Sequence, residues 1–204
     1  LKLYNLELSA KENPTQPTPA TTLEAQRAEF SRQPFLAMPL AGALAWAAIG
    51  LLSPWLTATG KVWLVYGATG SIFYLGLLIA RFTGEDLLGR HKPKNPFDGL
   101  FMAGVTGAVL VFAIAIPFGM ADYTSIPLSV GILTGLMWMP FSWIIQHWIG
   151  YFHAIARTLL LLAAWYLWPE QRFIVLPAIV VAIYAITLFV LARRYHRMPA
   201  SPTP

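Results

Sequence analysis

The chain has 204 residues, of which 57% are hydrophobic and only 11% are charged, whereas globular domains carry about 25% charged residues. This composition excludes an ordinary water-soluble domain and predicts an all-α, polytopic integral membrane protein. In a membrane protein the position of the basic residues matters more than the net charge, here +5, so no nucleic-acid partner is expected. The absence of cysteine excludes disulfides, thiolate metal sites and cysteine nucleophiles.

The N-terminal region divides into a tail and a short helix. Residues 1–21 are polar and contain three prolines, a composition that cannot bury enough apolar surface to fold alone, so we expect a disordered or partner-bound tail. Thr21 and Glu24 then fit the capping-box pattern, with Thr21 as the N-cap. Residues 22–34 are therefore predicted to form an interfacial amphipathic helix, which Pro34 ends.

Residues 35–194 are predicted to form a six-helix transmembrane domain, because about 20 apolar residues are enough to cross a bilayer once. Two long apolar stretches need an internal break. Ser53-Pro54 and the segment 57–60 supply a turn in the first stretch, and the second stretch must break near residues 146–150. The predicted spans are 35–56, 62–82, 99–118, 125–145, 148–168 and 173–192, and residues 195–204 form a C-terminal tail.

The basic residues predict the orientation of these spans. They gather before the first span, in the loop at 83–98 and after the last span, whereas the opposite side has only Lys61 and Arg172. Lysine and arginine are enriched in cytoplasmic loops, so both termini and the loop at 83–98 are expected to face the cytoplasm.

Small residues recur at a spacing of four, which places them on one face of a helix and lets backbones approach closely in lipid. Such faces predict helix packing, either within one bundle or between subunits. The predicted helix-packing pairs are Gly67 with Ser71, Gly104 with Ala108, and Gly131 with Gly135.

Arg157 is the most informative charged residue. It lies well inside the fifth predicted span, where a cation costs at least about 2.5 kcal/mol on insertion scales. His153 lies one turn earlier and Gln146 extends the same stripe, so Gln146, His153 and Arg157 form a predicted ligand or structural polar site. No acidic residue occurs in any predicted span. Arg157 is therefore expected to use carbonyls, hydroxyls, a water-filled cavity or an anion; the candidate hydroxyls are Thr106, Ser129, Thr134 and Tyr184.

Three roles for Arg157 follow from this reasoning: a structural clamp among helices, snorkelling towards the cytoplasmic interface, or binding of an anionic ligand, lipid headgroup or substrate. His147 and His153 raise the question of a haem or chlorin-type pigment, since imidazole is the one good metal ligand that the chain offers. Six residues apart on a helix, the two imidazoles point to different faces. We therefore predict no metal and no cofactor, with a haem or chlorin pigment as the alternative.

The order of features also resembles a known family. An amphipathic lead, a glycine-containing first span, Lys94-Asn95-Pro96 and the segment Trp138-Met139-Pro140-Phe141 resemble an uncharacterised family of small bacterial membrane proteins, a domain of unknown function, over about residues 22–192. The resemblance implies a multi-pass protein of the bacterial inner membrane. It implies no activity and assigns no functional residue.

The chain offers no nucleophile with a base, no zinc motif and no phosphate loop, so no enzyme is predicted. The leading hypothesis is a non-catalytic accessory or structural subunit of a larger bacterial membrane complex, with an energy-transducing complex as one candidate. Its expected partners are the lipid bilayer and other membrane protein subunits, contacted through the tails and the small-residue faces. The alternative is a small-solute or lipid transporter with a polar site around Arg157.

Overall fold

The computed structural model describes residues 22–88 and 95–198. The predicted N-terminal tail, the centre of the basic loop and the last residues of the C-terminal tail lie outside these ranges. Within them, every regular element is a helix, which confirms the predicted all-α class. The elements are α2 (Leu23–Ser31), α3 (Ala37–Leu52), η1 (Ser53–Trp55), α4 (Ala58–Gly70), α5 (Ile72–Thr83), α6 (Pro96–Leu110), α7 (Phe112–Ala121), η2 (Tyr123–Ser125), α8 (Ile126–Gly135), α9 (Trp138–Ile145), α10 (Ile149–Leu167), η3 (Pro169–Gln171) and α11 (Arg172–His196).

Several of these helices are long and apolar enough to cross a membrane. Five segments in the described residues meet this criterion, and the number rises to six if α4 and α5, which meet at an angle of 45°, are counted as one span. A bilayer requires every backbone N–H and C=O to bond within the protein, so such stretches fold as helices. The five segments are Ala37–Trp55, Pro96–Ala121, Tyr123–Ile145, Ile149–Leu167 and Pro169–His196.

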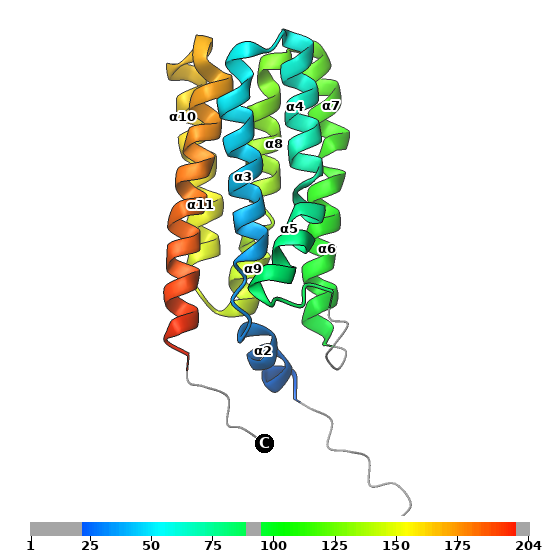
Figure 1. The fold of residues 1–204 in the computed structure, drawn as a ribbon, viewed down its shortest axis with the longest axis vertical. Helices are drawn as coiled ribbons and strands as arrows, with labels where there is room; N and C mark the ends of the chain where they lie inside the picture. Colours follow the sequence, from blue (N-terminus) through cyan, green and yellow to red (C-terminus); the bar gives the residue numbers. More distant parts are fainter. Residues whose placement is uncertain (1–21, 89–94, 199–204) are drawn as a thin grey trace, which may run out of the picture.

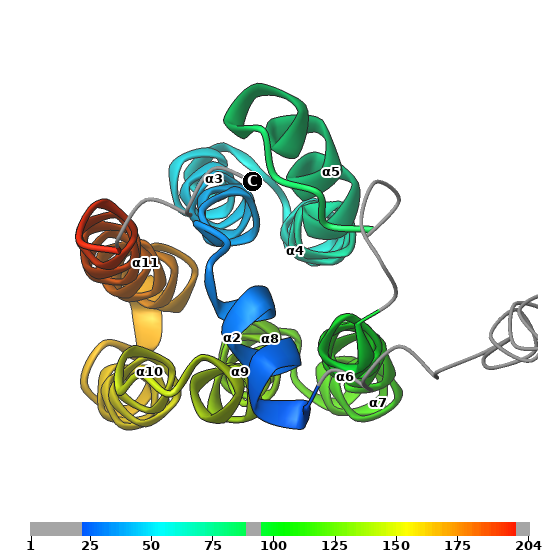
Figure 2. The same ribbon diagram turned by 90° about the horizontal axis from the view of Figure 1, so that it is seen from below.

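The long helices stand side by side in an upright bundle (Figure 1). Seen from below, one side of the bundle consists of α3, α4 and α5 (Figure 2). The other side consists of α10, the pair α8 and α9, and the pair α6 and α7, and α11 lies at one end between the two sides. The short helix α2 and the C-terminal end of α11 lie at the same end of the bundle (Figure 1). The chain therefore enters and leaves the bundle at one end.

The predicted break near residues 146–150 is confirmed. α9 ends at Ile145, its C-cap Gln146 has a left-handed backbone with φ 50°, and α10 begins at Ile149. Because Gly150 has no side chain, α10 can pack closely against α9. A Cβ atom at Gly150 would collide with the carbonyl oxygen of Trp138 and lie 2.7 Å from Cβ of Ser142.

The helix at residues 22–34 was predicted to start from Thr21, and this N-cap is wrong by one residue. The hydroxyl of Thr22 accepts the N–H of Ala25 at 3.2 Å, and α2 runs over Leu23–Ser31. Two adjacent threonines are equally able to cap, so the pattern alone does not choose between them.

α2 packs across the end of the bundle and is not held only by the bilayer interface (Figure 2). Phe30 is buried, and its ring centroid lies 5.1 Å from that of Phe35 and 6.3 Å from that of Phe97. The guanidinium of Arg27 lies 4.4 Å from the ring centroid of Trp143 on α9. α2 therefore joins the start of the first long helix to α6 and α9.

Glu85 supplies the cap that α3 lacks. Leu36 precedes α3 and offers no side-chain acceptor, but Oε1 of Glu85 accepts the N–H groups of Leu36 and Ala37, both at 2.9 Å. A carboxylate is favourable at a helix N-terminus because free N–H groups and the helix dipole point towards it. Glu85 is only 8% exposed. Burial raises its pKa above the ordinary 4.5, while the bonds from Ala37, Leu36 and the side chain of Thr83 act in the opposite direction.

Glu85→Gln tests this cap through its pH dependence. Because the folded-state pKa of Glu85 is raised above 4.5, wild-type stability from this group is full below pH 4.5 and is lost as the pH rises through the folded pKa. The glutamine keeps an acceptor and does not ionise, so we expect the variant to gain stability relative to wild type from pH 4 to pH 7. Thermal unfolding in detergent measures this difference. Equal pH dependence in the two proteins would contradict it, and Glu85→Ala should lose about 0.5–2 kcal/mol as the cap disappears.

Gly150→Ala tests the crossing of α9 and α10. The added methyl group would overlap Trp138 and Ser142, so we expect the free energy of unfolding to fall by about 1–3 kcal/mol. Gly70→Ala is the matched control, because nothing lies within 4 Å of a Cβ there. The control should be neutral or stabilising by up to about 1 kcal/mol. Equal melting temperatures for both variants would contradict the packing described.

Candidate functional site

The side chain of Arg157 lies in the interior of the bundle, where it is 0% exposed. Its own helix, α10, and two neighbouring helices supply its hydrogen-bond acceptors. Its Nη2 donates to the hydroxyl of Thr134 on α8 at 3.2 Å. Its Nη1 donates to Nε2 of His153, one turn earlier on α10, at 3.3 Å, and to the hydroxyl of Tyr184 on α11 at 3.4 Å. The guanidinium thus joins α8, α10 and α11.

Hydrogen bonds around Arg157 fix where each proton lies. The hydroxyl of Thr134 donates to the carbonyl of Val130 at 2.6 Å, which leaves its lone pairs for the arginine. The hydroxyl of Thr187 donates to the carbonyl of Ile183 at 2.8 Å and therefore accepts the Nδ1–H of His153 at 2.9 Å. With its proton on Nδ1, the neutral imidazole presents a lone pair on Nε2. All of these acceptors are uncharged.

Aromatic rings enclose the same cation. The indole of Trp138 stacks on the imidazole of His153, with centroids 4.3 Å apart and planes at 20°. The Cζ of Arg157 lies 5.4 Å from the ring centroid of Trp46 and 5.5 Å from that of Tyr184, distances at which the ring faces attract a cation. The ring faces of Trp46 and Tyr184 therefore stabilise the positive charge of Arg157 electrostatically.

One nitrogen of the guanidinium makes none of these hydrogen bonds. Nε of Arg157 is buried and has no hydrogen-bond partner in the described residues. Arg157, His153 and Thr187 are each 0% exposed, and only Thr134, at the edge of the cluster, is partly exposed. The arrangement can clamp three helices together, and an anion could enter only if the helices moved apart.

The bundle around Arg157 falls inside a match to a family model that covers residues 23–194. The chain belongs to a family of unknown function, DUF7010. This confirms the resemblance to an uncharacterised family. No curated protein and no solved structure matches the chain. The DUF7010 match begins at the first residue of α2 and ends near the C-terminus of α11, so it includes both the helix across the bundle end and the Arg157 cluster.

Gln146 does not join His153 and Arg157 in the DUF7010 fold. It ends α9 in a left-handed conformation, it is exposed, and its Nε2 donates to the carbonyl of Trp143 at 2.6 Å. The stripe that linked Gln146 to Arg157 assumed one continuous helix, whereas the chain turns between α9 and α10. The structure brings together only His153 and Arg157 of that predicted set.

His147 and His153 lie apart, and each is engaged in the protein. Both ring nitrogens of His153 are used, by Thr187 and Arg157, while Nδ1 of His147 accepts the N–H of Ile149 at 3.3 Å. An axial ligand to haem or chlorin needs a free imidazole nitrogen, which His153 lacks in this arrangement. In residues 22–88 and 95–198, no group of three or more His, Asp or Glu is placed to hold a metal ion.

Two of the predicted small residues make room for the site. A Cβ at Gly131 would lie 2.6 Å from Cδ1 of Leu161, and a Cβ at Gly135 would lie 3.1 Å from Cδ of Arg157. Glycine at these two positions lets α10 and its arginine approach α8. The glycines of the other two predicted pairs make no close helix contact within this protein, since a Cβ at Gly67 or Gly104 would meet nothing within 4 Å.

Of the hydroxyls predicted to compensate Arg157, two contact it and two do not. Thr134 and Tyr184 are bonded to it, whereas Ser129 and Thr106 donate to carbonyls of their own helices. The role of Thr187 was not predicted, because it acts through the imidazole. Thr187 lies three residues after Tyr184 and so on the same face of the helix. This spacing is the sequence signal that could have predicted a contact between Thr187 and His153.

Thr134→Val tests the clamp. The valine keeps the volume but removes the acceptor of Nη2, and a buried charged donor without a partner costs about 1–3 kcal/mol or more. We expect a matching fall in the free energy of unfolding in detergent. Thr106→Val is the control, because Thr106 is exposed and makes the same bond to the carbonyl four residues earlier. Loss of stability in both variants, or in neither, would show that Arg157 does not depend on Thr134.

Proposed function

We propose that this protein is a non-catalytic accessory or structural subunit of a larger membrane complex, lying in the inner membrane of a bacterium with six transmembrane helices and both termini in the cytoplasm. The segment Pro96–Ala121, which comprises α6 and α7, carries the proposal. Only 6% of its most apolar window is buried within the protein, against 39–50% for the other four segments that meet the same criterion. This helix packs little on its own bundle.

Small residues on α6 favour a protein partner over lipid alone. A Cβ at Gly99, Gly104 or Gly107 would meet nothing within 4 Å. Lipid chains need no glycine beside them, whereas a neighbouring helix can approach most closely where side chains are absent. Glycine in a helix interior also costs about 0.5–1 kcal/mol relative to alanine. The open face of α6 therefore suits the transmembrane helix of another subunit.

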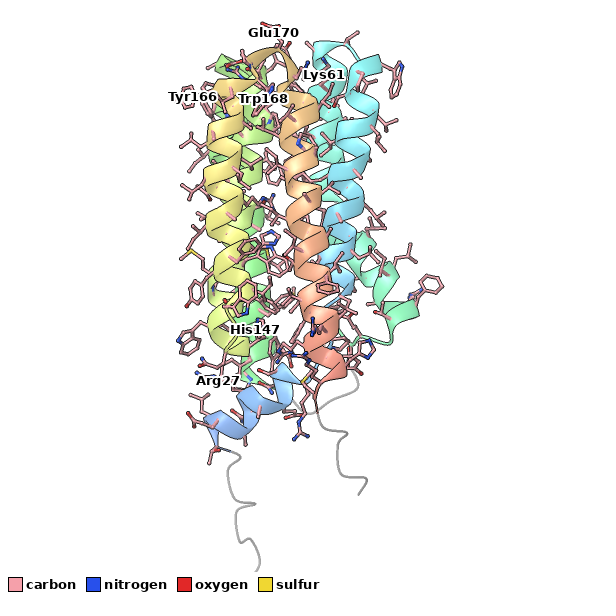
Figure 3. The ribbon with its side chains drawn as sticks, turned by 90° about the vertical axis from the view of Figure 1, so that its left-hand side faces the viewer. Arg27, Lys61, His147, Tyr166, Trp168 and Glu170 are labelled. Atoms are coloured by element: carbon pink, nitrogen blue, oxygen red, sulfur yellow. The ribbon has the colours of Figure 1, made fainter. Side chains whose placement is uncertain are left out.

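The distribution of charge supports the proposed orientation. Arg27 and His147 lie at the end of the bundle that holds α2, whereas Lys61 and Glu170 lie at the opposite end (Figure 3). Arg81, in the last turn of α5, and the arginines that end α11 lie at the same end as α2, since Glu85 bonds to Leu36 and Arg194 bonds to Ser31. By the positive-inside rule, the end with α2 is cytoplasmic.

The enclosed Arg157 cluster is consistent with a structural role. Its acceptors come from the protein itself, and it ties α8, α10 and α11 into one unit that can present a fixed outer surface. The alternative, a small-solute or lipid transporter, draws on the break between α8 and α9, which lies between Thr134 and Trp138 beside the cluster. Broken helices line substrate sites in many transporters. Transport by purified protein in liposomes that is abolished by Arg157→Ala would favour this alternative.

Purification from native membranes in mild detergent tests the accessory role. We expect a stoichiometric membrane partner in the wild-type preparation, detected by mass spectrometry. Gly104→Leu and Gly107→Leu should release it, because the larger side chain prevents close helix approach. Ala163→Leu on the exposed side of α10 is the matched control and should retain the partner.

Two outcomes would contradict the proposal. The first is wild-type protein that migrates as a monomer or small homo-oligomer with no other protein. The second is a partner that α6 variants retain as well as the control does. Deleting residues 1–20, which lie outside the described residues, asks separately whether the N-terminal tail contributes to the same association.

A further inference from the structure

A groove of about 520 Å³ opens between the start of α10 and the end of α11. It lies at the end of the bundle that holds α2, where Figure 3 places His147. Its polar lining consists of His147 and the arginines Arg193, Arg194 and Arg197. The described part of the lining contains no carboxylate. The groove is separate from the Arg157 cluster and from the open face of α6.

Arg194 is held in place at the base of this groove. Its Nη2 donates to the carbonyl of Ser31, at the end of α2, at 2.6 Å. Its Nη1 is buried and has no hydrogen-bond partner in the described residues. Within those residues the side chains of Arg193 and Arg197 make no hydrogen bond, and both residues are exposed. The groove therefore holds one fixed guanidinium with a spare donor and two others that are free to bind.

His147 adds another donor to the arginines. Its Nδ1 accepts the N–H of Ile149, so the proton of the neutral imidazole lies on Nε2. Burial, and then the charge of Arg194, lower the pKa of His147 below its ordinary 6.5, so the ring is neutral at pH 7. All the side-chain donors of the groove can serve an anion, and the lining offers no side-chain acceptor that would suit a cation.

The same groove continues into an apolar surface. Phe189, Arg193 and Arg197 are spaced by four residues on α11, so they form one stripe from the hydrocarbon region towards water. Phe189 is 65% exposed and Trp148, at the start of α10, is 56% exposed. A free phosphate ion would use only the charged part of this stripe. A phospholipid would use both parts, with its acyl chains on the aromatic rings.

We propose that this groove binds one anionic phospholipid, with its phosphate held by Arg193, Arg194, Arg197 and His147 and its acyl chains lying against Phe189 and Trp148. Basic pockets between transmembrane helices on the cytoplasmic side are suited to acidic headgroups. The site does not depend on the accessory role, because its lining comes from this chain, from the turn before α10 and the end of α11, and no other subunit is needed to form it.

Native mass spectrometry of the delipidated full-length protein tests the site. The probes are phosphatidylglycerol and phosphatidylcholine with identical acyl chains, added in equal amounts. We expect preferential retention of phosphatidylglycerol. Roughly 1 kcal/mol per basic residue near an anionic surface corresponds to a fivefold change, so Arg193→Gln and Arg197→Gln should each weaken binding about fivefold.

Arg81→Gln is the matched control, because it removes one exposed positive charge at the same end of the bundle and lies outside the groove. Its affinity for phosphatidylglycerol should equal that of wild type. Three outcomes would overturn the proposal: equal retention of the two lipids, an equal loss in Arg81→Gln, or displacement of the lipid by millimolar inorganic phosphate. The last would mark a site for small anions instead.

Discussion

The constraint on which this bundle depends is a buried arginine, Arg157, that has only uncharged hydrogen-bond partners among the described residues. Arg157 must keep its charge solvated by protein groups, because a bare cation in a medium of low dielectric is costly. Neutral acceptors from α8, α10 and α11, together with the ring faces of Trp46 and Tyr184, take the place of water. None of these groups is strong alone. Their directions are fixed, so the three helices must keep their relative positions for these hydrogen bonds to persist.

That requirement explains features that otherwise have no connection. Gly135 is small because the arginine passes over it, and Gly131 is small because Leu161 follows one turn later on α10. Thr187 touches no part of the arginine, but it sets the tautomer of His153 and so decides that a lone pair faces Nη1. In contrast, α6 and α7 take no part in the cluster and bury little of their surface. The molecule thus has one part that the Arg157 cluster joins together and another, α6 and α7, that is largely uncovered.

Hydropathy was sufficient to predict that the apolar segments are helical, because backbone groups in lipid have no partner but one another, but it did not predict the breaks between α4 and α5 or between α8 and α9. It also marked Arg157 as unusual, since a charge stands out in an apolar stretch. The partners of Arg157 were harder to predict: Thr134 is 23 residues away and Tyr184 is 27, so their approach depends on how the helices pack. Gln146 was wrongly grouped with Arg157 because the stripe was drawn across a turn. Glu85 gave no local signal at all, since the helix start that it caps lies 48 residues earlier.

The tautomer of His153 is the most direct measurement of this account. Solid-state NMR of protein labelled with ¹⁵N histidine in lipid bilayers at pH 7, with His153→Gln to assign the signal, distinguishes a protonated from an unprotonated ring nitrogen. The account requires a neutral imidazole protonated at Nδ1, with Nε2 accepting from Arg157. A neutral ring protonated at Nε2, or an imidazolium, would leave Nη1 of Arg157 facing another donor and would contradict the clamp.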